Sequence, residues 1–344
     1  MELNMKNTKS AFMMVQLKDE LMKGRYPVGS RFPSEYELAE RFQVNKTTAN
    51  KVVGLLVADG FLERRTSGGG TGVIRNAVFP KGTLVYLTAI QDEFYSRLLH
   101  GAQSGAYNRG YLISYLYVNP DNLDFALDQL EQARIPGMLT SCYGRITRSL
   151  SFPVVHVDRV LDRGKYNTVV NDYCLGGRMI GEMLLKYGHH DIVYFSSDPL
   201  PEHMSLRRKG TFEILAKAGV CDLERRFFPG ESNRFSSLSR LKQARKRFPN
   251  LTAIVGDTDH DVFNVHALLG EAELQAERIS FAGYGNISSL QKLFPLTTID
   301  QHPIEMGRHA ANLLVDIVEG HVKEPCQETM EVELIDRGSI HPVR

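Results

Sequence analysis

The chain has 344 residues, of which 42% are hydrophobic and 24% are charged, and its formal net charge is +1. This length suggests two or three domains, each large enough to bury a core, and the composition excludes a disordered, fibrous or membrane-embedded chain. No apolar run approaches the roughly 20 residues needed to span a bilayer, and no secretion signal is evident, so we expect a cytoplasmic protein without a membrane partner.

The charge is unevenly distributed along the chain. Residues 1–80 contain 12 Lys and Arg against 8 Asp and Glu, whereas the remaining 264 residues contain 29 against 32. A small basic head therefore precedes a larger, slightly acidic body. A basic segment is only weak evidence for a polyanionic partner, so the pattern of residues within the head carries more weight.

The head is predicted to contain three short helices. Met14, Leu17 and Leu21 lie on one face of the first, and Ser34 and Glu37 match a capping box that begins the second. The third begins after an asparagine cap, and its apolar residues recur at i, i+3, i+4 and i+7: Asn45, then Ala49, Val52, Val53 and Leu56. A tight pair of helices whose second member exposes polar and basic side chains fits the DNA major groove.

Two segments that resemble strands follow, at residues 61–65 and 72–74, and a glycine-rich loop at residues 66–71 joins them. Such a hairpin can approach a phosphate backbone closely because glycine has no side chain. We therefore predict a small α+β winged helix-turn-helix domain at residues 1–75. Its candidate DNA-binding residues are Ser34, Tyr36, Lys46, Thr47, Thr48, Asn50, Lys51, Arg65, Gly68, Gly69 and Gly70.

This order of segments resembles the GntR family of bacterial regulators over about residues 10–75. The match rests on Phe32-Pro33-Ser34-Glu35, on Leu56-x-x-x-Gly60-Phe61-Leu62-x-Arg64-Arg65 and on Gly69-Gly70-Thr71. The resemblance implies double-stranded operator DNA as a partner. Where the family usually has arginines that touch DNA, this chain has Tyr36, Lys46 and Asn50. Asn50 is suited to adenine and Lys46 to a phosphate, so the operator sequence is not carried over.

The body alternates apolar strands with amphipathic helices, which indicates parallel sheets covered on both faces. We predict a linker at residues 76–82 and a two-lobed α/β domain with doubly wound parallel sheets at residues 83–344. Lobe one takes about residues 83–158 and 300–322, and lobe two about 162–296 and 327–338. The predicted strands are 83–88, 111–118, 137–141, 154–158, 168–171, 191–196, 253–256, 280–283 and 297–300.

The body resembles the ligand-binding part of the LacI/GalR repressors and, more distantly, the periplasmic sugar-binding proteins. The match rests on Val170-Asn171-Asp172 through Asp191-Ile192, on Arg207-x-x-Gly210, and on Pro295 through Gln301 and onward to Leu314. The combination with a GntR head is known in arabinose-responsive repressors. The resemblance implies a small carbohydrate effector in a cleft at the carboxyl ends of the strands.

Charged and amide side chains that form paired hydrogen bonds with vicinal hydroxyls, together with aromatic faces, are typical of sugar sites. Tyr284 through Asn286 replaces the usual aromatic–Asp pair of the family, so one expected carboxylate is missing. A structural ion pair or helix cap remains the alternative explanation for each candidate. The candidate effector-binding residues are Asp158, Arg207 and Asp257, then Asp300 and Gln301 as weaker ones, and Phe94 or Tyr95 for stacking.

Several segments resemble metal-binding motifs but lack the residues that such motifs require. Asp257-x-Asp259-x-Asp261 begins like a calcium loop but lacks the glycine and glutamate that such a loop requires, and His189-His190 is better explained as a turn after a helix. The cysteines lie far apart without a CxxC pair, so we expect neither zinc nor a disulfide framework. We therefore expect no metal, no cofactor and no enzymatic activity. The four cysteines are Cys142, Cys174, Cys221 and Cys326.

The sequence thus favours a ligand-responsive transcription regulator, most simply a repressor of carbohydrate-utilisation genes. In this hypothesis a homodimer binds a pseudo-palindromic operator, and a sugar that closes the cleft changes the operator affinity. Two alternatives stay open at this point. The head is fused either to an enzyme-like body, such as an aminotransferase, or to a solute-binding body without allosteric control of DNA.

Overall fold

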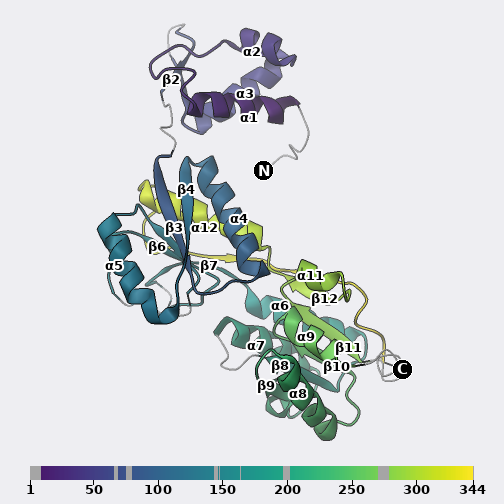
Figure 1. Cartoon of the computed structure of the whole chain (residues 1–344). Coiled ribbons are helices and arrows are strands. Elements are labelled where there is room, and N and C mark those ends of the chain that lie inside the picture. Colours follow the sequence, from purple (N-terminus) through teal and green to yellow (C-terminus); the bar gives the residue numbers. More distant parts are fainter. Residues whose placement is uncertain are drawn as a thin grey trace. The chain divides into compact units, whose positions relative to one another are not determined.

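The computed structural model describes residues 9–65, 69–74, 80–142, 146, 148–162, 164–196, 202–269 and 279–343. Its contacts divide the chain into two compact units (Figure 1). The first holds residues up to Thr83 together with Tyr107–Leu112, and the second holds the rest. Among the helices described, none is both long and apolar enough to cross a bilayer.

The head is a winged helix. Its elements are α1 (Lys9–Met22), α2 (Glu35–Phe42), α3 (Lys46–Ala58) and the antiparallel strands β1 (Leu62–Arg64) and β2 (Thr71–Val73). A single hydrophobic cluster joins the three helices to the hairpin. Met13 rather than Met14 completes the buried face of α1, because Met13, Leu17 and Leu21 follow the i, i+4, i+8 spacing and are all fully buried.

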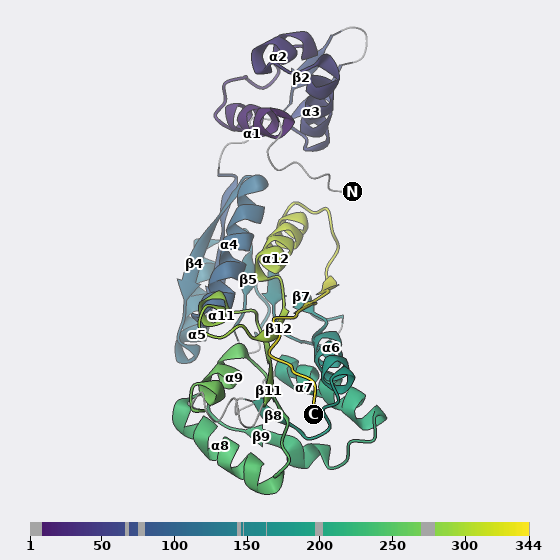
Figure 2. The same ribbon diagram turned by 90° about the vertical axis from the view of Figure 1, so that its right-hand side faces the viewer.

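The body contains two six-stranded sheets among the described residues (Figures 1 and 2). In the first sheet the order is β13-β7-β6-β5-β3-β4, and every strand pair with a described register is parallel. Helices α4 and α12 pack closely against each other, and α12 lies along β5, β6 and β7, while α5 contributes to the core on β3 and β5. The strands are β3 (Gly82–Thr88), β4 (Tyr111–Tyr117), β5 (Met138–Thr140), β6 (Val154–Val157), β7 (Asn167–Asn171) and β13 (Gln327–Met330), and the helices are α4 (Glu93–Asn108), η1 (Pro120–Asn122), α5 (Leu123–Ala133) and α12 (Pro303–Val318).

In the second sheet the order is β14-β12-β11-β10-β8-β9, parallel except for β14, which runs antiparallel to β12. Helices α6 and α7 pack on each other, and their side chains share a core with one face of the sheet, while α8 and α9 cover the other. The strands are β8 (Ile192–Ser196), β9 (Phe227–Pro229), β10 (Ala253–Gly256), β11 (Ser280–Tyr284), β12 (Thr297–Asp300) and β14 (Glu333–Ile335), and the helices are α6 (Tyr173–Lys186), α7 (Glu202–Lys217), η2 (Leu223–Arg226), α8 (Arg234–Arg247), α9 (Asp259–His266) and α11 (Ser288–Gln291).

The fold class predicted from the sequence is confirmed, but the assignment of two strands to lobe two was wrong. Strand β7 pairs with β6, and β13 pairs with β7, so both belong to the sheet of the first lobe. The sequence predicts that the chain passes between the lobes directly after Asp158. The chain leaves the first lobe one strand later, where β7 leads into α6.

In the head, Glu20 joins α1 to α2 and to the loop between them. Its carboxylate accepts hydrogen bonds from Arg25 Nη1 at 2.7 Å, Tyr26 Oη at 2.8 Å and Arg41 Nη1 at 2.8 Å. The hydrogen bond from Arg41 is the largest of the effects that together lower the pKa of Glu20 to about 2, and burial opposes it. The three partners therefore depend on one buried charge.

We expect Glu20→Ala to lower the free energy of unfolding of the head by about 2 kcal/mol, because it leaves Arg41 and Tyr26 without their acceptor. The folded pKa lies below the ordinary 4.5. The contribution is therefore complete above the ordinary pKa and is lost as the pH falls toward the folded value. Calorimetry of the full chain at pH 7 and pH 3 measures this difference. Equal losses for Glu20→Ala and for the exposed Glu40→Ala would contradict the assignment.

Candidate functional site

Side-chain caps fix where the two helices of the helix-turn-helix begin. Ser34 forms the predicted capping box with Glu37: the Glu37 amide donates to Ser34 Oγ, and the Ser34 amide and hydroxyl donate to the Glu37 carboxylate. Asn45 Oδ1 accepts from the Thr48 amide at 2.7 Å and caps α3. The Ser34 hydroxyl is therefore already engaged in the cap.

The predicted recognition residues of α3 gather on one exposed surface. Lys46, Thr47, Asn50 and Lys51 are exposed, and Thr48 is half-buried. The ring of Tyr36, at 69% exposure, extends from α2 toward the same place, with Lys46 Nζ 3.9 Å from its centroid. A cation over an aromatic face in this geometry is attracted to it. The structure thus brings Tyr36 and Lys46 together beside the start of α3.

The wing residues that were predicted to contact DNA differ in their exposure and in their contacts. Gly69 and Gly70 are exposed, and Gly70 has a φ of +71°, which favours glycine. Gly68 lies outside the described residues. Arg65, predicted to contact DNA, instead donates from Nη2 to the Gly29 carbonyl at 2.9 Å. Sequence reasoning also passed over its neighbour Arg64, which contacts α3.

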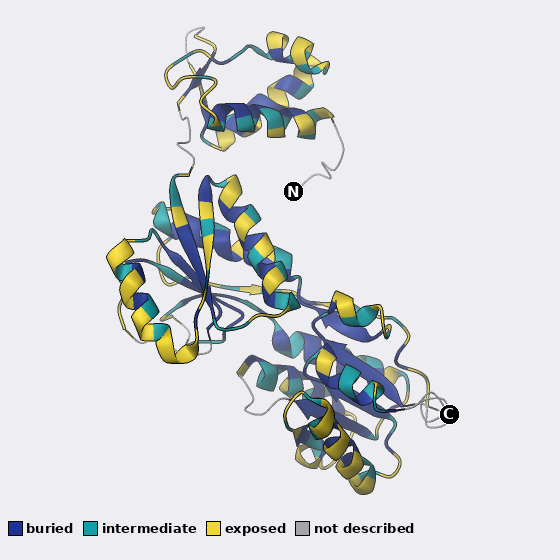
Figure 3. Cartoon of the chain, in the orientation of Figure 1, coloured by how far each residue is buried: buried dark blue, intermediate teal, exposed yellow. Residues whose placement is uncertain are grey.

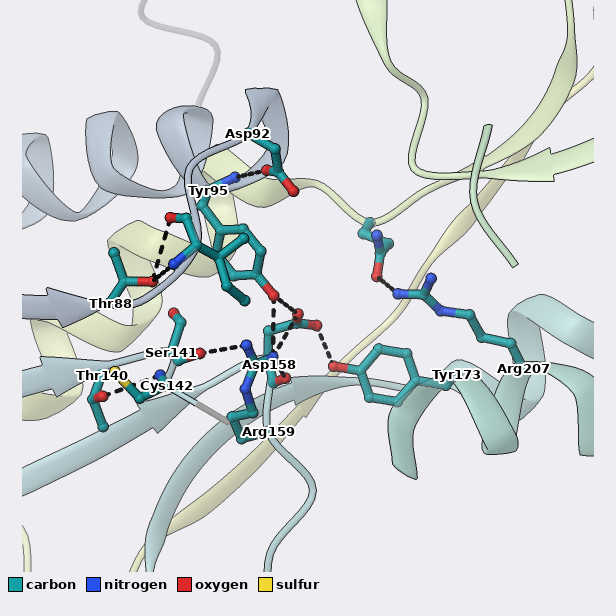
Figure 4. A network of polar contacts seen from close by, with 12 residues as sticks. Thr88, Asp92, Tyr95, Thr140, Ser141, Cys142, Asp158, Arg159, Tyr173 and Arg207 are labelled. Atoms are coloured by element: carbon teal, nitrogen blue, oxygen red, sulfur yellow. Dashed lines mark hydrogen bonds and ion pairs between the residues drawn. The ribbon is translucent and has the colours of Figure 1, made fainter. Parts of the chain in front are cut away.

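In the sensor, Asp158 lies at the end of β6 and is 2% exposed. Tyr95 Oη donates to its Oδ2 at 2.7 Å, Tyr173 Oη donates to its Oδ1 at 2.5 Å, and Arg159 Nη1 lies 3.2 Å from Oδ2 (Figure 4). Burial raises the pKa of Asp158, but His203, Arg159, Arg207 and the Tyr173 hydroxyl outweigh burial and leave it below its ordinary value. Asp158 is therefore a buried, charged acceptor.

Arg207 lies where α6 and α7 pack most closely. A Cβ on Gly177 would lie 2.0 Å from the Arg207 carbonyl oxygen, so only glycine allows this approach. Arg207 is 4% exposed and donates to the Asp257 carbonyl at 2.8 Å and to Gln301 Oε1 at 2.9 Å. Its guanidinium lies 4.1 Å from the Tyr284 ring centroid. Burial lowers its pKa, but Tyr284, Asp158 and Asp257 outweigh burial and raise it, so Arg207 stays charged.

Asp257, at the end of β10, is completely buried. Tyr194 Oη donates to Oδ1 at 2.6 Å, and Ser196 Oγ donates to Oδ2. Burial raises the pKa of Asp257 to about 8 against the lowering effect of Tyr194 and Arg207. At neutral pH its carboxyl group is therefore mainly protonated, in contrast to Asp158.

The weaker candidates surround these groups. Asp300 accepts from Asn286 Nδ2 at 2.7 Å and from the His302 amide at 2.8 Å, which gives it a structural role at a turn. Gln301 is 3% exposed and contacts Arg207. Phe94 is half-buried and meets the Tyr95 ring edge-on, with centroids 5.1 Å apart. A cavity of about 440 Å³ lies beside Tyr95, lined among others by Ile90, Gln91, Asp92 and Tyr115.

Sequence reasoning missed several members of this polar network. Tyr173 begins α6 directly after its cap Asp172, and Arg159 is the next residue after Asp158, so both had a signal in their position. Nothing in the sequence marked His203. Its ring centroid lies 5.5 Å from that of Tyr173, and burial lowers its pKa to about 3, which leaves it neutral.

Asp259 of the acidic triplet and His189 of the histidine pair serve the fold. Asp259 accepts from the Ile287 amide and from Thr298 Oγ1, and His189 lies within hydrogen-bonding distance of Thr252 Oγ1 at 2.9 Å and of the His341 carbonyl at 2.8 Å. Within the described part of the chain, no group of three or more His, Cys, Asp and Glu is arranged to bind a metal ion.

We expect Asp257→Asn to raise the melting temperature more at high pH than at low pH. The folded pKa of about 8 lies above the ordinary 3.8, so the wild-type carboxyl group costs stability as the pH rises between these values. The variant lacks this titration. Thermal unfolding at pH 5 and pH 8.5 measures the gap, which we expect to widen by several degrees. The exposed Asp124→Asn is the control variant, and the same gap for both variants at both pH values would contradict the assignment.

Two family models match the chain. Residues 11–73 match bacterial regulatory proteins of the gntR family, and residues 182–340 match the periplasmic binding protein-like domain. The HTH-type transcriptional repressor PurR of Yersinia pestis is 24% identical over 267 residues, which cover 74% of this chain and 78% of the repressor.

Two solved structures share the fold. A LacI family transcriptional regulator from Enterococcus faecium with bound ribose has a TM-score of 0.65 at 21% identity and covers 76% of this chain and 100% of its own. The complex of the transcriptional regulator CelR with cellobiose has a TM-score of 0.66 at 18% identity and covers 97% of this chain and 100% of its own. The chain therefore joins a DNA-binding head of the gntR family to a LacI-like, periplasmic-binding-protein-like sensor, and it is a transcriptional regulator.

Proposed function

We propose that this regulator represses carbohydrate-utilisation genes and that a small carbohydrate is its effector. The observation that carries the proposal is the buried polar network around Asp158 and Arg207, where a charged carboxylate, a guanidinium and the Gln301 amide lie beside tyrosine rings. Groups of this kind form paired hydrogen bonds with vicinal hydroxyls. The ribose and cellobiose named for the two similar structures support the same ligand class.

Repression is supported by the relatives, which are named as transcriptional repressors. They also disfavour the alternative of an enzyme-like body. In the head, polar and basic groups for operator DNA come from Lys46, Thr47 and Asn50. Ser34 contributes through the cap that fixes the start of α2. We include Tyr36, Thr48, Lys51, Gly69 and Gly70 in this proposed surface, while Arg65 contributes through the shape of the wing.

A second copy of the chain completes the proposal. Strand β4 lies at the edge of the first sheet and is partly exposed (Figure 3). Its Tyr115 is 38% exposed and its Tyr117 is 50% exposed. Two exposed tyrosine side chains on an edge strand favour contact with another protein surface. A dimer would present two heads to the two halves of a pseudo-palindromic operator, which matches the symmetry of such sites.

The side chain of Glu93 links the two lobes, so it can couple the binding of a ligand between them to their movement. It lies in the first turn of α4, and its carboxylate accepts from the Ser288 amide at 2.7 Å, the Ser289 amide at 3.2 Å and Ser289 Oγ at 2.8 Å. Burial raises the pKa of Glu93, but these hydrogen bonds outweigh it and lower the pKa to about 2. Glu93 therefore stabilises the arrangement in which the two lobes are in contact.

To test the effector proposal, the full chain first selects DNA duplexes from genomic fragments, and these duplexes serve as the operator. We expect one sugar among ribose, cellobiose, other pentoses and hexoses and their phosphates to change operator affinity about 5- to 150-fold. Fluorescence anisotropy measures the affinity, and sedimentation of the same complex counts the chains per duplex. Arg207→Lys is expected to keep operator binding but lose the response. Tight operator binding that no sugar changes would contradict the effector, and one chain per duplex would contradict the dimer.

We expect Glu93→Gln to weaken binding of the identified sugar by about 1 kcal/mol, roughly fivefold, because the contact between the lobes loses its charged acceptor. Isothermal titration measures this loss. Deuterium uptake at the amides of Ser288 and Ser289 should rise in the same variant. The matched control is Glu182→Gln, an exposed residue of α6. If both variants bind the sugar equally well, Glu93 has no part in closure.

A further inference from the structure

The two adjacent arginines at the end of β1 point to opposite sides of the wing. Arg65 lies against the wing itself: a Cβ on Gly72 would be 2.4 Å from Arg65 Nε, and Nη2 donates to the Gly29 carbonyl. Arg64 turns instead toward the helices. Residues that follow each other in a strand alternate between its faces, which accounts for the difference.

Arg64 bridges the two helices of the helix-turn-helix. Its Nη1 donates to Glu35 Oε1 at 3.1 Å, and its Nη2 donates to Asn50 Oδ1 at 2.5 Å. Glu35 is the first residue of α2, and Asn50 lies on the exposed surface of α3. The Arg64 side chain is 50% exposed. A guanidinium from the wing strand thus lies on the proposed operator-binding surface.

We propose that Arg64 is a specificity-determining residue and that, with Asn50, it recognises guanine in the major groove. This inference rests on the operator binding proposed above. It supplies the guanidinium that Tyr36, Lys46 and Asn50 do not provide, from a different element of the fold.

The argument follows from hydrogen-bond chemistry. A guanidinium only donates, so the amide oxygen of Asn50 must be the atom that faces Arg64, and Asn50 Nδ2 with its two hydrogens faces away. The pair therefore presents mainly donors. Guanine offers two neighbouring acceptors in the major groove, N7 and O6, whereas adenine offers N7 beside a donor. Asn50 alone suits adenine, but Asn50 held by Arg64 suits guanine.

Glu35 makes this arrangement specific to arginine. It binds one end of the guanidinium while Asn50 binds the other, which requires a planar group with two separate donor nitrogens. A lysine at this position would keep the positive charge but has a single nitrogen. Arg64→Lys therefore separates the loss of orientation from the loss of charge.

The test is selection from a pool of randomised duplexes with the full chain, comparing wild type, Arg64→Lys and the matched control Arg25→Lys, a head arginine that is 61% exposed and is not part of the proposed surface. We expect wild type and Arg25→Lys to enrich guanine at one position of each half-site. In Arg64→Lys the preference for guanine over adenine at that position should fall about 5- to 150-fold, the range of one good bidentate contact. Thermal unfolding of each variant checks that the head is folded.

The outcomes are distinguishable. Enrichment of the same guanine by Arg64→Lys would overturn the inference. So would a uniform loss of affinity for all duplexes with a shallower salt dependence, because that is the behaviour of a phosphate contact. Failure of the wild type to enrich any sequence would instead overturn operator binding itself. As a second variant, Asn50→Ala should remove the same guanine preference, and retention of guanine would contradict the pairing with Arg64.

Discussion

A buried carboxylate at the end of β6 accepts hydrogen bonds from both lobes of the sensor. Tyr95 reaches Asp158 from α4 of the first lobe, and Tyr173 reaches it from the start of α6 on the second. Asp158 also has a φ of +57°, a conformation that non-glycine residues rarely adopt. Buried tyrosine hydroxyls need partners, and a buried charge needs donors, so each group satisfies the other. The relative placement of the two sheets depends on this contact.

The two aspartates at strand ends illustrate how neighbours rather than residue type decide the charge. Asp158 has two guanidinium groups nearby, and its pKa is lowered. Asp257 accepts hydrogen bonds from two hydroxyl groups. Tyr194 and Arg207 lower its pKa, but burial outweighs them and raises the pKa to about 8. The strand ends of the sensor therefore carry one charged acceptor and one carboxyl group that is mainly protonated.

The sequence predicted the strands that form continuous apolar runs and missed those that do not. The central strands are such runs, and all of those predicted were found within a residue or two. Strands β9, β13 and β14 are as short as β5, β10 and β12, but Phe228 is their only buried residue, so no apolar run marked them. The pairing of β7 with β6 is a tertiary property that no local pattern encodes. Tyr173 and Arg64 were missed because their partners lie in other elements, although the position of Tyr173 directly after a helix cap and the strand alternation at Arg64 and Arg65 each held a signal.

Both halves of the chain orient a side-chain amide with an arginine from another element. In the head, Arg64 of β1 binds Asn50 Oδ1, and in the sensor, Arg207 of α7 binds Gln301 Oε1. Because a guanidinium accepts nothing, each contact forces the amide nitrogen to face away from the arginine. An amide alone can present either its oxygen or its nitrogen to a ligand. The arginine removes that freedom, so the groups that each proposed site presents depend on a residue that lies in a different element and that the identity of the amide does not reveal.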